Sequence, residues 1–387
     1  MSFLSFFKKE EEVSLLIDIG SGTITVALAS FSKKVPEFLY CTKGSFPKTD
    51  RLLSSKLTTS MGTLLDSTLA SVISEGLNNK KITRVVVSFA SPWYIFKSKE
   101  VRLTENKPFV VTKSFLEDLS TKEEKLFKKE LSSESSAEEK GVWSVIEKSI
   151  VHTKINGYIL NESLGKKTSS FDAFMYMSAI AKNVEEKVLN KILKHTHLSK
   201  NKVLMHTFPL ISFLTIRENF AETSDFLLVD VAGEVTDISS SKGDIISQNT
   251  SIPLGRNFII RQIAKHSKTS NEIAESTLQM YLSKKTDEHL STLIQKILLD
   301  IEKEWFIYFQ DMLHSLFPKG NYPNKIFLIV DSDVSPIFLE YLKSFKMETV
   351  LVNEEILKDL YTTLPNVKPD QFIIILADFY NNLRQGQ

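Results

Sequence analysis

Two short segments place an aspartate at the end of an apolar run and follow it with a turn of small residues. Residues 15–26 read LLIDIGSGTITV, and residues 226–238 read FLLVDVAGEVTDI. Glycine and serine in such turns let backbone N–H groups converge on an anion, because no large side chain blocks the approach. An aspartate at each strand end suits a hydrated Mg²⁺, which proteins hold through one or two carboxylates and the ligand's phosphates. The pair therefore predicts two halves of one phosphate clamp.

Either segment alone is weak evidence, since Asp-x-Gly after a strand is more often an ordinary hairpin turn. The pair is more informative because strand, aspartate, turn and strand recur in the same order at the front of each half of the chain. The sequence contains no G-x-x-x-x-G-K-[ST], which excludes a P-loop. No G-x-G-x-x-G follows a strand and opens a helix, which argues against a Rossmann site.

On these residues the chain resembles the actin-like ATPase superfamily, with the two segments in place of its phosphate-1 and phosphate-2 loops. Within it the sequence is most similar to the cell-division actin FtsA and its relative PilM of type IV pilus machines. Three further stretches carry the resemblance, at 147–180, 252–264 and 325–330. The resemblance implies an α/β, actin-like (ribonuclease H-like) two-domain fold with an inserted SHS2-type subdomain. It also implies that Asp18 and Asp230 meet across one interdomain cleft.

Carried over residue by residue, the resemblance implies binding sites for ATP and Mg²⁺ but no catalytic residue. The implied nucleotide-binding residues are Asp18, Gly20, Ser21, Gly22, Thr23, Asp230, Gly233, Thr236, Asp237 and Gly255. Asp18 and Asp230 are the implied metal ligands.

The second loop and the adenosine segment depart from the family pattern. Ala232 replaces a glycine, and Glu234 brings a carboxylate that we expect to face the γ-phosphate region and oppose triphosphate binding. Asp331-Ser332-Asp333 replaces paired glycines, and its side chains are expected to crowd the purine. We therefore expect weakened nucleotide binding and at most a weak ATPase.

Composition is typical of a soluble globular protein. The 387 residues are 42% hydrophobic and 25% charged, and the net charge of +1 provides no electrostatic reason to expect nucleic acid. The single Cys41 excludes an intramolecular disulfide. No run approaches the length of a membrane span and no signal peptide precedes the first strand, so we expect a cytoplasmic protein.

Periodicity predicts an α/β first half, an inserted strand–helix–strand–strand unit and a second half with a helical insertion. Helices are expected over 52–77, 183–195 and 208–217 and through most of 258–317, and the last strand over 372–377. His195 and His197 form the one close histidine pair, which we expect at a surface or helix cap. The expected division is a tail at 1–12, a first actin-like half (1A) at 13–90, an SHS2-like subdomain (1C) at 91–180, the start of the second half (2A) at 181–263, a helical 2B-like subdomain at 264–320 and the rest of 2A at 321–387.

The tail at 1–12 holds Phe3, Phe6 and Phe7 at helical spacing, followed by two lysines. It could act as an interfacial foot giving peripheral contact with the inner membrane face, or it could be a frayed terminus.

The resemblance leaves three functions open. The first is an FtsA-like scaffold that links division machinery to the membrane and self-associates into filaments. The second is a PilM-like adaptor of a pilus assembly platform. It is favoured by an all-helical stretch at 267–317 and by the lack of a C-terminal linker and amphipathic helix such as FtsA proteins carry. The third is an active actin-fold ATPase or sugar-kinase relative, which fold analogy alone does not support.

Overall fold

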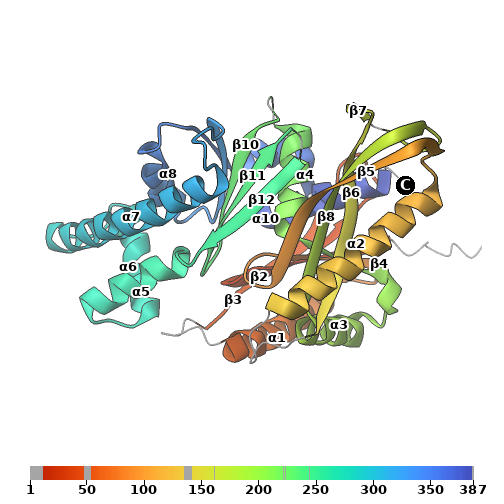
Figure 1. Ribbon diagram of the computed structural model, residues 1–387. Helices are drawn as coiled ribbons and strands as arrows, with labels where there is room; N and C mark the ends of the chain where they lie inside the picture. The colour runs from red at the N-terminus through yellow and green to blue at the C-terminus, as the bar shows by residue number, and fades with distance from the viewer. Residues whose placement is uncertain are drawn as a thin grey trace, which may run out of the picture.

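The computed structural model describes residues 12–47, 54–134, 142–160, 162–220, 222, 224–243 and 245–385 (Figure 1). The tail with Phe3, Phe6 and Phe7 lies outside the described residues. Three β-sheets account for the strands of the described chain. In the same ranges, no helix is both long and apolar enough to cross a membrane.

The first sheet has the strand order β15-β3-β2-β1-β4-β9. Its strands are β1 (Glu12–Ile19), β2 (Thr23–Ser30), β3 (Glu37–Ser45), β4 (Lys81–Phe89), β9 (Val203–Thr207) and the short β15 (Thr362–Thr363). One face packs on helices α1 (Ser54–Ser71) and α3 (Lys182–Thr196) through residues such as Leu15 and Ile17. A short π-helical turn, Val72–Gly76, extends α1.

The second sheet repeats this plan with the order β12-β11-β10-β13-β14. Its strands are β10 (Phe226–Val231), β11 (Thr236–Lys242), β12 (Ile245–Ile252), β13 (Lys325–Val330) and β14 (Glu348–Val352). In both sheets the first strand lies between an antiparallel neighbour that follows it directly and a parallel neighbour reached by a crossover. The two halves therefore place the end of β1 and the end of β10 in equivalent positions.

Helices cover the outer face of the second sheet. They are α5 (Arg256–Ser267), α6 (Asn271–Leu282), α7 (Glu288–Leu316) and α8 (Ser335–Lys343). Leu227, Val229 and Trp305 belong to the core that these helices share with the sheet. The helical character expected for 258–317 is confirmed. His197 caps α3 in the left-handed conformation, as expected, and the partly buried His195 pairs with Asp66 on α1.

Two buried helices lie between the two sheets. α4 (Phe208–Asn219) and α10 (Gln371–Gln385) share one core with Leu16 of the first sheet and Leu228 of the second. The strand predicted for 372–377 is wrong, because these residues form α10. Side chains buried on every side give an unbroken apolar run, and such a run does not distinguish a buried helix from a buried strand.

The third sheet, of order β5-β8-β6-β7, is inserted between β4 and α3. It comprises β5 (Tyr94–Val110), β6 (Trp143–Ile155), β7 (Tyr158–Leu160) and β8 (Lys167–Ala181), with α2 (Lys113–Glu134) packed on it. The expected strand–helix–strand–strand unit is confirmed, with the short β7 as an additional strand between β6 and β8 in the sequence. Figure 1 shows this unit and helices α5–α8 at opposite ends of the molecule.

The chain returns to the first half after this insertion. α3 packs on α1, and β9 pairs with β4, so residues 182–207 lie with the first sheet although the expected division assigned them to the second half. The remaining short elements are α9 (Glu354–Leu357) and the 3₁₀ turns Lys200–Lys202 and Lys358–Leu360.

Candidate functional site

The turns that follow β1 and β10 have the same internal hydrogen bond. Gly20 N donates to Thr23 O at 3.0 Å, and Ala232 N donates to Val235 O at 2.9 Å. Each turn follows the aspartate that occupies the next-to-last position of its strand, Asp18 in β1 and Asp230 in β10. The repeat recognised in the sequence is therefore a repeat of backbone geometry.

The two turns touch each other across the junction of the halves. A Cβ atom added to Gly233 would lie 2.4 Å from Gly22 Cα, and one added to Gly22 would lie 2.8 Å from Gly233 Cα. Glu234 N donates to Ser21 Oγ at 2.9 Å. Backbone packs on backbone here, so glycine is required on both sides. Gly22, Ser21 and Gly233 are thus brought together.

Gly255 packs closely against the backbone of the second turn. A Cβ atom there would lie 2.5 Å from Ala232 O and 2.7 Å from Gly233 O. The next two residues begin α5 and donate backbone hydrogen bonds to those same carbonyls, Arg256 N at 3.1 Å and Asn257 N at 2.7 Å. Gly255 therefore fixes the turn against the start of α5.

Asp18 and Asp230 are buried and lie close enough for their charges to interact. Burial raises the pKa of Asp18 to about 7, although a hydrogen bond from Ser88 Oγ lowers it. Burial, and then the charges of Asp237, Asp18 and Asp331, raise the pKa of Asp230 well above its usual value. Asp230 Oδ1 is buried without a hydrogen-bond partner. Both carboxyls would be stabilised as anions by a nearby cation.

The remaining predicted residues of the second loop are held by the protein itself. Thr236 Oγ1 donates to Leu254 O at 2.8 Å. Asp237 accepts from Tyr94 Oη at 2.9 Å and from Ser251 Oγ at 2.5 Å, and burial raises its pKa. Thr23 contributes its carbonyl to the first turn. The structure places these side chains in supporting positions around the turns.

The expected repulsion from Glu234 does not follow, because its carboxylate is compensated within the protein. Asn257 Nδ2 donates to Glu234 Oε1 at 2.8 Å, Arg261 Nη1 donates to the same oxygen at 3.0 Å, and Arg261 Nη2 lies 2.8 Å from Oε2. Both partners are on α5. Sequence reasoning missed them because nothing in the local pattern pairs α5 with the turn.

The two aspartates of the segment 331–333 also form ion pairs. Lys43 Nζ of β3 lies 2.7 Å from Asp331 Oδ1 and 3.1 Å from Asp370 Oδ2. Asp333 accepts from Arg256 Nε at 3.1 Å and from Gln279 Nε2 at 2.8 Å. Asp331 and Asp333 therefore tie neighbouring elements together.

The donor set fits a hydrated magnesium ion better than a metal held only by side chains. Among the described residues, no three His, Cys, Asp or Glu side chains are arranged to enclose a metal. Asp18 and Asp230 supply two carboxylates, one with a free buried oxygen, and Mg²⁺ keeps most of its water and phosphate ligands.

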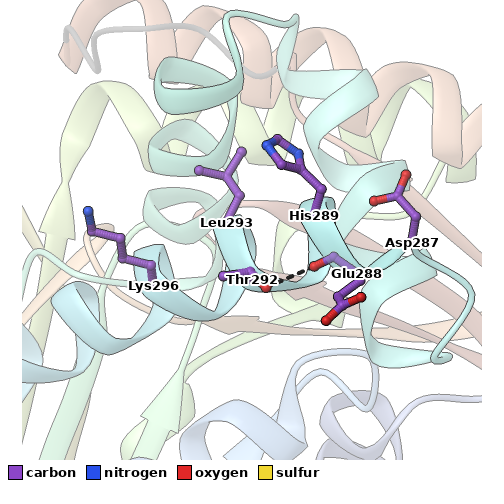
Figure 2. Close-up of a pocket in the computed structure, with 6 residues that line it drawn as sticks. All are labelled: Asp287, Glu288, His289, Thr292, Leu293 and Lys296. Atoms are coloured by element: carbon purple, nitrogen blue, oxygen red, sulfur yellow. Dashed lines mark hydrogen bonds between the residues drawn. The ribbon is translucent and has the colours of Figure 1, made fainter.

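One hollow lies along α7, and a second lies beside Tyr94 and Ser251, two residues that donate to Asp237. The first, drawn in Figure 2, runs along the start of α7, where Thr292 Oγ1 donates to Glu288 O at 2.8 Å and the lining side chains all come from one helix and its cap. The second, of about 500 Å³, lies between β5 and β12, the outer strands of their sheets, and Ser98 Oγ bridges it to Ile246 O at 2.7 Å. It is lined mainly by uncharged polar side chains.

Comparison with known proteins found similar structures but no similar sequence family. No family model matches the chain, and no curated protein matches it. A chain of the PilM–PilN type IV pilus biogenesis complex matches with a TM-score of 0.63 at 14% identity, over 97% of this chain and 98% of that one. The ethanolamine utilization protein EutJ from Carboxydothermus hydrogenoformans matches with a TM-score of 0.49 at 9% identity, over 95% of this chain and 89% of that one.

A third structure, from Bacteroides thetaiotaomicron VPI-5482, is described as having an actin-like ATPase fold and unknown function. It matches with a TM-score of 0.44 at 12% identity, over 89% of this chain and 93% of that one. The match to the PilM–PilN chain extends over nearly all of both chains and shows the fold. The two paired sheets with matching turns, together with this match, confirm the predicted fold class. The chain has an actin-like fold, which it shares over nearly its whole length with the matched chain of the PilM–PilN complex.

Proposed function

We propose that this chain is a nucleotide-responsive adaptor, which binds ATP with Mg²⁺ weakly at the junction of its halves and engages a protein partner. The observation that carries the proposal is the contact between the two turns at Gly22 and Gly233, with Asp18 and Asp230 beneath them. A phosphate group at this junction would touch both halves at once. Its binding would therefore affect how the halves are held together.

The chain's own residues have separate roles in this proposal. Asp18, fixed by Ser88, and Asp230, with its free oxygen, would hold the hydrated cation, which supplies positive charge to the phosphates. The turn that contains Gly20, Ser21 and Gly22 would present backbone N–H groups to the anion, except that of Gly20, which donates to Thr23 O. Glu234 stays directed at Arg261 and so adds no uncompensated charge.

An adaptor role is favoured over an efficient enzyme by the way the polar groups are used. Thr236, Asp237, Asp331 and Asp333 are all engaged in hydrogen bonds or ion pairs that support the fold. Using them in turnover would require breaking these contacts. We infer slow or negligible ATP hydrolysis.

Among adaptors, the PilM-like role has the better support, although the sequence alone favours an FtsA-like one. The matched structure is a complex of PilM with PilN, and the match spans almost the whole chain. In addition, α5, α6 and α7 form an all-helical unit where FtsA-like proteins are expected to have a strand pair. The partner would then be a protein of a membrane-bound pilus platform.

Nucleotide binding and partner choice are tested separately. Thermal unfolding with increasing Mg²⁺–ATP should show a small saturable rise in midpoint, since a ligand that prefers the native state stabilises it. Asp230→Asn should lose most of that rise. A saturable rise accompanied by steady ATP turnover would instead identify an enzyme.

Partner choice is tested by binding of two labelled peptides, one from the N-terminus of a pilus-platform protein and one from the C-terminal tail of FtsZ. Selective binding of the first is expected. Binding of the tail peptide alone would restore the FtsA-like role, and binding of neither would remove both. Filament formation and membrane contact remain proposals, to be tested by sedimentation with and without liposomes, for the full chain and a chain lacking residues 1–12.

A further inference from the structure

Lys43 lies in a row of polar residues that crosses the first sheet. Asp18 on β1 is the register partner of both Ser88 on β4 and Thr25 on β2, and Thr25 is the partner of Lys43 on β3. Directly opposed residues share a face of a sheet, so these four side chains project toward the same side. That side is the one facing α10 and the second half.

The Lys43 ammonium joins carboxylates supplied by the other half. Asp331 directly follows β13 of the second sheet, and Asp370 caps α10 by accepting from Ile373 N at 3.1 Å. Lys43 Nζ lies 2.7 Å from the first and 3.1 Å from the second, while Thr25 Oγ1 donates to Asp370 at 2.9 Å. The ion pairs therefore connect β3 of the first sheet to the end of β13 in the second sheet and to the start of α10.

Lys43 contacts two members of a cluster of carboxylates, Asp331 and Asp370, and the other two members are Asp18 and Asp230. The charges of Asp331 and Asp370 both act on Asp18, and those of Asp18 and Asp331 act on Asp230. One ammonium cannot balance them. The buried Asp230 is 7% exposed, and its Oδ1 has no hydrogen-bond partner, so an acceptor at the junction is left for a cation.

We propose that Lys43 is the built-in counter-ion of this carboxylate cluster and competes there with a divalent cation. Without a cation, the lysine balances Asp331 and Asp370 and joins the halves. When a cation enters beside Asp18 and Asp230, it and the ammonium repel each other, so the lysine sets how weakly the cation binds. The consequence for nucleotide binding rests on the proposed function, but the competition itself does not.

The test is a titration of the nucleotide-free full chain with Mn²⁺, followed by electron paramagnetic resonance of the free ion. Wild type should bind weakly. Lys43→Met should bind at least about tenfold more tightly, because a unit positive charge that acts on the buried Asp18 is removed. Lys43→Arg, which keeps the charge, should behave like wild type. Lys325→Met is the matched control, since it removes another sheet lysine paired with a carboxylate, Glu348 at 3.3 Å.

The outcome that overturns the proposal is Lys43→Met binding Mn²⁺ no better than wild type and Lys325→Met. A gain that persists when Asp230→Asn is added would also overturn it, because the ion would then lie elsewhere. If Lys43→Met does not fold, the double variant Lys43→Met/Asp331→Asn removes the pair as a unit and should still bind more tightly than wild type. The Mg²⁺–ATP unfolding assay is scored separately, so failure of nucleotide binding is distinguishable from failure of this inference.

Discussion

Replacing Gly233 by alanine tests whether the halves meet as the structure shows. The added Cβ would lie 2.4 Å from Gly22 Cα and 2.6 Å from Gly22 N, so one backbone must move away from the other. Overpacking of this kind costs about 1–3 kcal/mol, and separation of the turns would also break the Glu234 N to Ser21 Oγ hydrogen bond, worth about 1 kcal/mol. We expect a loss of about 2–4 kcal/mol in the free energy of unfolding.

The assay is urea unfolding followed by circular dichroism, in which that loss should lower the midpoint by about 1 M. Gly20→Ala is the matched control, because it lies in the facing turn and its Cβ would approach nothing closer than Thr23 O at 3.3 Å. Its cost should stay below about 1 kcal/mol. Both changes restrict the unfolded chain equally, so the comparison isolates the native contact. Equal midpoints for the two variants would refute the close approach of the turns.

Three further predictions follow from burial and charge. The pKa of Asp18 is raised to about 7, so the folded state binds more protons than the unfolded state between about pH 4 and 7. The free energy of unfolding of the wild type, measured without divalent cations, should therefore fall as pH rises through this window. Asp18→Asn should reduce that fall, as measured by urea unfolding. An unchanged slope in that variant would contradict the assignment. Arg261→Met leaves the buried Glu234 carboxylate without its cationic partner and should cost about 3 kcal/mol, the lower end for a broken buried pair because Asn257 still donates; adding Glu234→Gln should recover most of it in the same assay. The buried Trp305 stacks on Phe309 with 4.7 Å between ring centroids. Trp305→Ala should lower the free energy of unfolding by about 3–5 kcal/mol. Trp305→Phe should cost much less, because the buried Nε1 has no hydrogen-bond partner; similar thermal midpoints for the two variants would show that the indole does not pack as described.

The parts of the fold that the sequence predicts are those with a local signal. A strand, an aspartate and a turn of small residues recur at Asp18 and Asp230, and the turns have the same backbone hydrogen bond. The helix α3 is predicted because its apolar residues fall on one face, with Val184 and Val188 buried. Such signals are readable within about a dozen residues.

The remainder depends on contacts between distant segments. Residues 372–377 of α10 form an unbroken apolar run because neighbours surround them, and this short run by itself gives no periodicity to assign. The return of β9 to the first sheet is decided by its pairing with β4 across the whole inserted unit. Two ion pairs join separate elements, Lys43 with Asp331 and Arg261 with Glu234. No sequence motif predicts either pair.

The placement of α4 and α10 between the sheets has a consequence for how the molecule unfolds. The same two helices cover the inner face of each sheet. If they leave one sheet, the inner face of the other sheet is exposed as well. β15, which comes late in the chain, also pairs with β3 near the beginning. We therefore expect one cooperative melting transition for the two actin-like halves, because unfolding of one half unfolds the other.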